Sequence, residues 1–243
     1  MSAAKAFETL TLDTDARGVA TLTLARPEKH NAMSGTMVEE LNVAAERLAT
    51  DPAIRLAVLT GEGRSFCAGG DLGWMQTQMT ASRESRMAEA MKLARALGAL
   101  NALPKPLIGR INGQAFGGGV GMMSVCDVAV AARGAKFGLT EVRLGLIPAT
   151  ISPYVVARMG EARARRVFFS ARLFDADEAL ELGLAGRVVE PEALDDAVEA
   201  EIAPYLAAAP EAVAASKALV RRLGPQVDEA LMQETARRLA DTW

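Results

Sequence analysis

The stretch AFGGGVG, residues 115–121, contains three consecutive glycines and a fourth one two positions later. Glycine costs conformational entropy, so such a run indicates either unusual backbone dihedrals or the close approach of another group. The apolar segment 107–111 before it predicts a strand, and residues 122–125 after it predict part of a helix. Backbone amides at the start of a helix are unpaired and carry the positive end of its dipole. The run therefore predicts a site for an anionic or polarised oxygen.

Two kinds of site share this physics, a phosphate cradle and an oxyanion hole. Gly119 and Gly121 begin the dinucleotide-binding pattern G-x-G-x-x-G, and Glu141 stands where a ribose-binding acid is expected. However, Ser124 occupies the third glycine position, the pattern falls in the middle of the chain, and no lysine follows as in a P-loop. These departures favour the oxyanion hole.

A second turn of small residues strengthens this interpretation. SFCAGGDL, residues 65–72, follows another apolar segment at 55–60 that predicts a buried strand. Two backbone N–H groups from separate loops can converge on one carbonyl oxygen, and each contributes about 2.7–4 kcal/mol of transition-state stabilisation when well aimed. The two turns together predict a site that polarises a carbonyl group.

The rest of the chain indicates an α/β protein with a largely buried sheet, followed by a mostly helical C-terminal part. Ser34 is the expected N-cap of the first helix. Strands are predicted over 7–12, 19–24, 55–60, 107–111, 126–132 and 186–189. Helices are predicted over 36–49, 84–103, 151–159, 161–170, 175–182, 192–207, 211–223 and 225–241.

Composition excludes several classes of function. The 243 residues carry a net charge of -3 without long runs of either sign, which argues against nucleic acid or an anionic membrane as a partner. One histidine, His30, and two cysteines, Cys67 and Cys126, are too few for a His/Cys metal centre or a disulfide framework. The N-terminus lacks a signal-peptide core, and no apolar run is long enough to cross a membrane. A soluble, cytoplasmic protein without a metal is expected.

Four segments, in this order, resemble the crotonase (enoyl-CoA hydratase/isomerase) superfamily: FCAGGDL at 66–72, INGQAFGGGVGM at 111–122, CDVAVAA at 126–132 and FGLTEVRLGLIP at 137–148. The resemblance implies an α/β fold, a crotonase-like spiral of repeated β-β-α units with a helical C-terminal region. It implies a catalytic core over 1–195 and a helical oligomerisation region over 196–243. Relatives continue beyond Trp243, so that region is expected to be shortened. A homotrimer or a dimer of trimers is also implied.

The resemblance further implies roles for individual residues. The N–H groups of Gly70 and Gly118 would hold the thioester oxygen of an acyl-CoA, and Glu141 would be the general acid/base. Coenzyme A would be part of the substrate, and no separate cofactor is expected. Further residues are expected to contact the substrate or its CoA group: Ala68 at the adenine, Arg26 and Lys29 at the phosphates, and Asp71, Leu72, Trp74, Gly117 and Gly121.

One departure from the family pattern leaves the reaction open. A two-carboxylate hydratase of this family carries a glutamate where this chain has Gly121, so only Glu141 remains to handle protons. Isomerases of the family use a single glutamate, at the position that Glu141 occupies in this chain. Nevertheless, GGDLGWM at 69–75 and EVRLGLIPATISPYVVARMG at 141–160 resemble methylglutaconyl-CoA hydratases. We therefore expect an enoyl-CoA hydratase, with a Δ3,Δ2-enoyl-CoA isomerase as the alternative. A non-catalytic acyl-CoA-binding or RNA-binding protein is the alternative of another class.

Several candidates also have purely structural interpretations. Asp71 is well placed to cap the helix that follows it. Cys67 and Cys126 are expected to be small core residues, and Trp74 is equally expected in the core.

Overall fold

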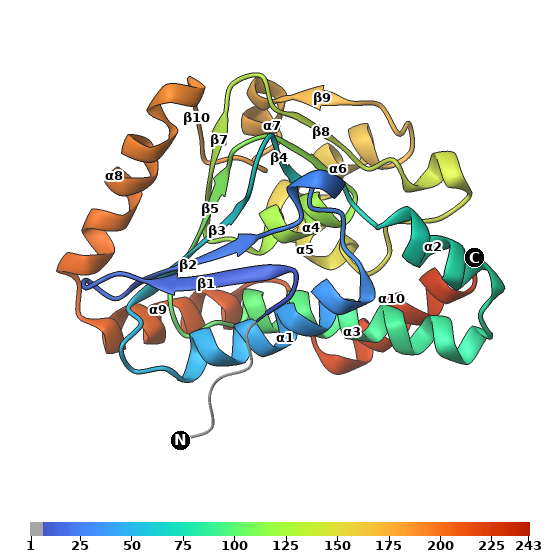
Figure 1. Ribbon diagram of the computed structural model, residues 1–243, viewed down its shortest axis with the longest axis horizontal. Helices are drawn as coiled ribbons and strands as arrows, with labels where there is room; N and C mark the ends of the chain where they lie inside the picture. The colour runs from blue at the N-terminus through green and yellow to red at the C-terminus, as the bar shows by residue number, and fades with distance from the viewer. Residues whose placement is uncertain (1–6) are drawn as a thin grey trace.

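The structure, a computed structural model, describes residues 7–243, and two sheets form its centre (Figure 1). The larger sheet has the strand order β1-β2-β3-β5-β7-β10, in which β1 and β2 are antiparallel and all other neighbours are parallel. Its strands are β1 (Leu10–Thr14), β2 (Val19–Leu24), β3 (Leu56–Gly61), β5 (Leu107–Ile111), β7 (Val128–Ala132) and β10 (Arg187–Val189).

The smaller sheet has the order β4-β6-β8-β9, and β4, β6 and β8 run parallel to one another. The last strand, β9, pairs antiparallel with β8. The strands are β4 (Ser65–Cys67), β6 (Gln114–Phe116), β8 (Lys136–Gly138) and β9 (Phe174–Asp175).

Three consecutive segments of the chain repeat one path through both sheets. Each segment contributes a strand to the larger sheet, then a short strand to the smaller sheet, and then a helical element. Strands β3 and β4 lead to α2 (Leu72–Thr80), β5 and β6 lead to α4 (Gly118–Val125), and β7 and β8 lead to the 3-10 helix η2 (Glu141–Leu144). The expected spiral of repeated β-β-α units is therefore confirmed.

Helices cover both faces of the larger sheet. On one side, α1 (Gly35–Thr50) and α3 (Arg83–Asn101) lie next to each other, and α10 (Glu229–Ala240) lies along α3 (Figure 1). On the other side, α8 (Leu194–Ala207) packs over β5 and β7. The remaining helices are α5 (Ser152–Met159), α6 (Glu161–Phe168), α7 (Ala176–Glu181), α9 (Pro210–Leu223), η1 (Pro27–Lys29) and η3 (Pro191–Ala193).

Alternation along the strands divides the core between these two faces. On β3, Leu56 and Val58 belong to the cluster beneath α8, whereas Ala57 and Leu59 belong to the main core on the side of α1 and α3. Successive strand residues point to opposite faces, so a central parallel strand covered on both sides must be apolar throughout. This explains why the apolar run at 55–60 was recognisable as a buried strand.

The first strand differs from its prediction. The strand expected over 7–12 is β1, Leu10–Thr14, because two local interactions shift it. The amides of Glu8 and Thr9 donate to the carboxylate of Glu40, at 2.6 and 2.8 Å, which takes them out of the ladder. At the other end, the Asp15 carboxylate accepts from the amide of Val19 at 3.0 Å and sets the hairpin register.

The other observed helix and strand boundaries agree with the predicted ones where the local sequence pattern is strong and differ where it is weak. The Ser34 hydroxyl accepts from the amide of Met37, so the predicted cap of α1 is confirmed. Helix α4 begins at Gly118, four residues before the predicted 122–125, because a glycine run gives no periodic signal. A helix after Asp71 was expected from its capping position, and α2 is that helix, although its bounds were not predicted. The short strands β4, β6, β8 and β9 were not predicted, since two or three residues carry no period. The predicted division between 195 and 196 falls inside α8. None of the helices within residues 7–243 is long and apolar enough to cross a membrane.

Candidate active site

Three adjacent parallel strands of the smaller sheet end at the same edge, and a predicted site residue follows each of them. Gly70 follows β4, Gly118 follows β6 and Glu141 follows β8. Ligand sites in α/β proteins form where the carboxyl ends of parallel strands meet. The repeated path of the chain therefore brings together three loops that are far apart in the sequence.

The first loop is held in place by Met33 and Asp71. The amide of Met33 donates to the carbonyl of Gly69 at 2.8 Å, and the amide of Asp71 donates back to the carbonyl of Met33 at 2.9 Å. The Asp71 carboxylate accepts from the amides of Gly73 and Trp74, so its predicted role as the N-cap of α2 is confirmed. This leaves Gly70 between two fixed neighbours.

The second loop explains the glycine triplet. Gly117 has φ +49°, and a Cβ on it would lie 2.8 Å from Oε1 of Glu141. A Cβ on Gly119 would lie 2.5 Å from the carbonyl oxygen of Cys67 in β4. The triplet is therefore needed both for its backbone conformation and for the close approach of β4 and of the Glu141 carboxyl.

The amides of Gly70 and Gly118 have no hydrogen-bond acceptor in the part of the chain that the structure describes. The side chains of two methionines lie close to these two glycines. A Cβ on Gly70 would lie 3.1 Å from Sδ of Met75, and one on Gly118 would overlap Cε of Met33. Met33 thus touches Gly118 with its side chain and Gly69 with its backbone. Flexible, polarizable methionine side chains thus lie against both glycines whose amides lack an acceptor among the described residues.

Glu141 is the first residue of η2, and it is half-buried as a whole. Its Oε2 atom is buried and has no hydrogen-bond partner within residues 7–243. Desolvation of the carboxylate raises the pKa of Glu141 to about 7, since burial penalises the charged form. A carboxyl poised near neutral pH can both accept and return a proton. A buried carboxyl oxygen without a hydrogen-bond partner is also costly to a fold, which indicates a role beyond stability.

The raised pKa predicts a dependence of stability on pH. Between about pH 4.5 and 7 the native carboxyl of Glu141 retains a proton that the unfolded chain has lost. The free energy of unfolding therefore falls as the pH rises through this interval, by about 3 kcal/mol. Glu141→Gln lacks this titration, so its Tm should rise relative to that of the wild type between pH 4 and pH 8. Scanning calorimetry at both pH values measures the difference, and a constant Tm difference would contradict the raised pKa.

Residues expected at the CoA group lie around the first loop. Arg26 donates to the carbonyl of Ala32 at 2.7 Å and pairs with Asp71 at 3.1 Å, and both side chains of this pair are less than one-fifth exposed. In the free protein Arg26 therefore fixes the start of α2. Lys29 is exposed in η1, and the amide of Ala68 donates to the carbonyl of His30. Their contacts with CoA stay predictions.

The remaining candidates lie on α2 and α4. Leu72 is exposed, and Trp74 stacks edge-on against Trp243 while its Nε1 donates to Glu89 at 3.3 Å. Gly121 lies inside α4, one turn after Gly117. Sequence reasoning missed Met33, because only the folded chain brings it against Gly118. Cys67 and Cys126 are buried, as predicted, and desolvation raises the pKa of both thiols to about 12, which keeps them inert.

Helix α2 carries a second buried group without a partner. Gln78 is its one buried residue, and the Oε1 atom accepts no hydrogen bond within residues 7–243. An unsatisfied buried acceptor costs about 1–3 kcal/mol, so Gln78→Met, which keeps the shape, should raise the free energy of unfolding by about 1 kcal/mol. Urea denaturation tests this, with Gln233→Met on the exposed face of α10 as the control. A less stable Gln78→Met variant would show that the amide has a partner in solution.

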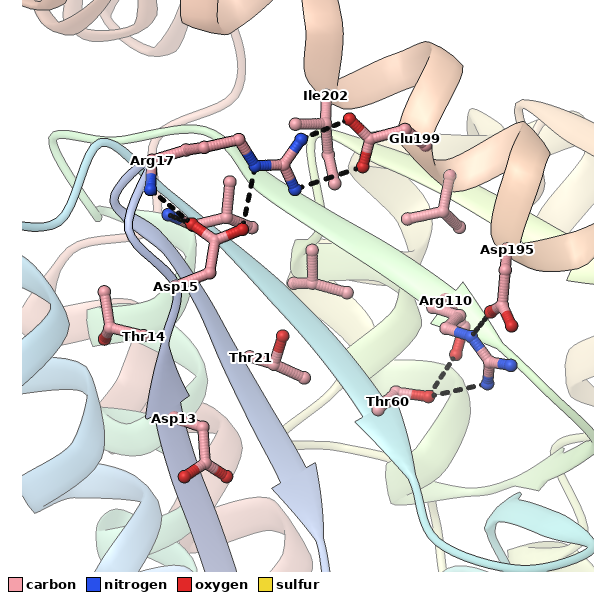
Figure 2. A pocket seen from close by; sticks show the side chains of 13 residues that line it. Asp13, Thr14, Asp15, Arg17, Thr21, Thr60, Arg110, Asp195, Glu199 and Ile202 are labelled. Carbon is pink, nitrogen blue, oxygen red and sulfur yellow. Dashed lines mark hydrogen bonds and ion pairs between the residues drawn. The ribbon is translucent and has the colours of Figure 1, made fainter.

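A cavity of about 650 Å³ lies away from these loops, between the β1–β2 hairpin, β3, β5 and α8 (Figure 2). Most of its charged side chains pair with one another: Arg17 bridges Asp15 and Glu199, and Arg110 pairs with Asp195 at 2.6 Å. None of the predicted site residues lines it. This cavity is thus separate from the unpaired amides and from Glu141.

Fold and site together define an α/β spiral protein in which two backbone amides without acceptors among residues 7–243 and a carboxyl with one buried oxygen follow adjacent strands of the smaller sheet. A family model described as enoyl-CoA hydratase/isomerase matches residues 14–240. The chain therefore belongs to the enoyl-CoA hydratase/isomerase family, and the predicted membership of the crotonase superfamily is confirmed.

Individual relatives agree with this family. The enoyl-CoA hydratase AKT6-1 of Alternaria alternata is 36% identical, over 84% of this chain and 67% of its own length. A crotonyl-CoA hydratase of Syntrophomonas wolfei subsp. wolfei is 34% identical, over 92% of this chain and 85% of its own. A crystal structure of an enoyl-CoA hydratase from Shewanella pealeana superposes with a TM-score of 0.87 at 36% identity, covering 97% of this chain and 88% of the other.

Proposed function

We propose that this protein is an enoyl-CoA hydratase that adds water to a 2-enoyl-CoA thioester. The observation that carries the proposal is the buried, unpartnered Oε2 of Glu141, next to Gly117 at the start of α4. Beside it lie the two amides of Gly70 and Gly118 without acceptors among the described residues. The relatives named as hydratases support the same assignment.

In the proposed reaction the thioester oxygen accepts hydrogen bonds from the amides of Gly70 and Gly118. The Glu141 carboxylate takes a proton from water while the water oxygen bonds to C3, and the C2–C3 π pair moves into an enolate. Charge then accumulates on the thioester oxygen, where the two amides stabilise it. Glu141 finally delivers its proton to C2, and the net change is the addition of one water. Coenzyme A enters as part of the substrate, and the proposal needs no other cofactor.

A second activity, Δ3,Δ2-enoyl-CoA isomerisation, is favoured by a specific feature. Position 121 carries no side chain, and among the described residues Glu141 is the carboxyl that approaches the start of α4. A single carboxyl suffices to carry a proton between C4 and C2 through the same enolate. A branched substrate such as 3-methylglutaconyl-CoA is the narrower form of the hydratase proposal, and it rests on the sequence resemblance alone.

The proposed assembly is a homotrimer or a dimer of trimers. Helix α9 has no buried residue, and Leu219, Val220 and Leu223 are 60, 70 and 78% exposed. An exposed apolar patch of this kind on a helix marks an interaction surface. Sedimentation equilibrium of the wild type and of Leu223→Glu would measure the assembly, and a monomeric wild type would contradict the proposal.

One assay distinguishes these activities. The purified protein is incubated with crotonyl-CoA, 3-methylglutaconyl-CoA and a 3-enoyl-CoA, and the absorbance of the conjugated enoyl thioester is followed. Loss of absorbance with the first two substrates supports a hydratase, whereas a gain with the third alone supports an isomerase. Binding of CoA esters without turnover would support a non-catalytic acyl-CoA-binding protein. Binding of RNA, without binding of CoA esters, would support an RNA-binding protein.

A further inference from the structure

Two glycines lie one turn apart, Gly117 at the N-cap of α4 and Gly121 within it, and each is approached by a different side chain. The amide of Gly121 donates to the carbonyl of Gly117 at 3.1 Å, so the two positions are stacked along the helix. The carboxyl of Glu141 lies over Gly117. Over Gly121 lies Ile151: a Cβ added there would overlap Cγ2 of Ile151 and lie 2.8 Å from its Cβ.

Ile151 is poorly able to move away. It is 2% exposed and stands at the N-cap of α5, where its carbonyl accepts from the amides of Tyr154 and Val155, both at 3.1 Å. Its branched side chain is also stiff at χ1. The contact with Gly118 is different in kind, because there the overlapping atom is the terminal methyl of Met33. The volume beside Gly121 is therefore closed, and it is closed by an aliphatic group.

Helix geometry shows what this closure prevents. The amide of Gly121 donates to the carbonyl of Gly117, so position 121 lies one helical turn, about 5.4 Å of rise, beyond the residue that the Glu141 carboxyl approaches. A carboxylate on residue 121 would thus start one turn from the position that faces Glu141, close enough for the two acids to share protons. Instead, Ile151 presents methyl groups at that place and keeps water and charge away from it.

We propose that Ile151 is the specificity-determining residue that keeps this site to one carboxyl, so that Glu141 must carry both proton transfers. The inference rests on the proposed acyl-CoA chemistry of the site and extends it. The absence of a glutamate at position 121 is therefore not the only feature that excludes a second carboxyl. Ile151, at the start of α5, also fills the space that a glutamate side chain would need.

The test moves the larger side chain from position 151 to position 121. Gly121→Glu and Ile151→Ala are made singly and together, with Ile54→Ala, another buried isoleucine, as the matched control truncation. Each single change should lower the Tm. The double variant Gly121→Glu/Ile151→Ala should lie above the sum of the single effects, because it conserves volume. Gly121→Glu combined with Ile54→Ala should be additive, and additive effects in both pairs would overturn the proposal.

Activity supplies the functional readout. Hydration of crotonyl-CoA by Gly121→Glu/Ile151→Ala should be about tenfold or more faster than by Gly121→Glu alone, because a second acid can then share the proton transfers. The pH profile of kcat/KM should gain a second ionisation. A folded double variant that shows neither the faster hydration nor the second ionisation would overturn the specificity role of Ile151.

Ile151→Ala alone keeps the inference testable even if the double variant does not fold. In Ile151→Ala, water should enter next to Gly121 and favour the ionised form of Glu141. The acidic limb of the pH profile of kcat/KM should then move to lower pH, whereas Ile54→Ala should leave this limb in place. An unmoved limb in Ile151→Ala would count against the proposal. If the wild type turns over no enoyl-CoA, the proposed function itself fails; if the wild type is active but the variants behave additively, only the role of Ile151 fails.

Discussion

Glu141→Gln is expected to lower kcat for hydration by about 10²–10⁴-fold with little change in the affinity for a saturated acyl-CoA. The carboxyl is the proton carrier of the proposed reaction, and its Oε2 is buried without a partner within residues 7–243. Glutamine keeps the shape and the contact with Gly117, but it cannot accept and return a proton at neutral pH. Since the two amides are untouched, binding of the thioester should persist.

Rates with crotonyl-CoA and the Kd of butyryl-CoA measure these two effects separately. Glu192→Gln, an exposed glutamate in η3, is the matched control and should behave as the wild type. Wild-type turnover by Glu141→Gln would exclude the single-glutamate mechanism. A loss of butyryl-CoA binding of the same size would mean that Glu141 holds the ligand and does not move protons.

Gly117→Ala is expected to have the next largest effect, because two costs coincide at this residue. Its φ of +49° disfavours any side chain, and the new Cβ would lie 2.8 Å from Oε1 of Glu141. The strained backbone should cost about 1–3 kcal/mol of stability. Displacement of the carboxyl by about an ångström should lower kcat/KM by about 10²-fold.

Gly134→Ala separates the two costs. Gly134 also has a positive φ, +90°, but a Cβ there would meet nothing within 4 Å. It should therefore lose stability without losing activity. Equal activity of the alanine variants at positions 117 and 134, measured below both Tm values, would show that the Glu141 carboxyl does not depend on the missing Cβ.

Much of the candidate site was predictable because its residues stand in contiguous motifs. Runs of small residues after apolar strands indicated exposed amides, and the family resemblance singled out Gly70 and Gly118 within those runs. Glu141 lies in the FGLTEVRLGLIP segment, and Asp71 directly precedes a helix that it caps. Long, periodic elements such as α1 and α3 were found within two residues of their ends.

Short elements were not predictable in the same way. Strands β4, β6 and β8 have three residues each, too few for alternation to be distinguished from chance, yet they form the edge that assembles the site. Their pairing depends on the parallel order of the whole smaller sheet. The first strand also began later than its apolar pattern indicated, because the carboxylate of Glu40, in α1, takes the amides of Glu8 and Thr9.

The sequence by itself determined the family, the order of the three loops and the candidate residues within each loop, because these depend on residue types within local motifs. It also showed that Gly121 lacks the second acid. Only the tertiary structure decided what that absence means. The Oε2 atom of Glu141 is buried without a hydrogen-bond partner within residues 7–243, and Ile151 closes the space beside Gly121, because packing brings together groups that are distant in the chain. A missing side chain is visible in a sequence, but what fills its volume depends on the packing of α5 against α4.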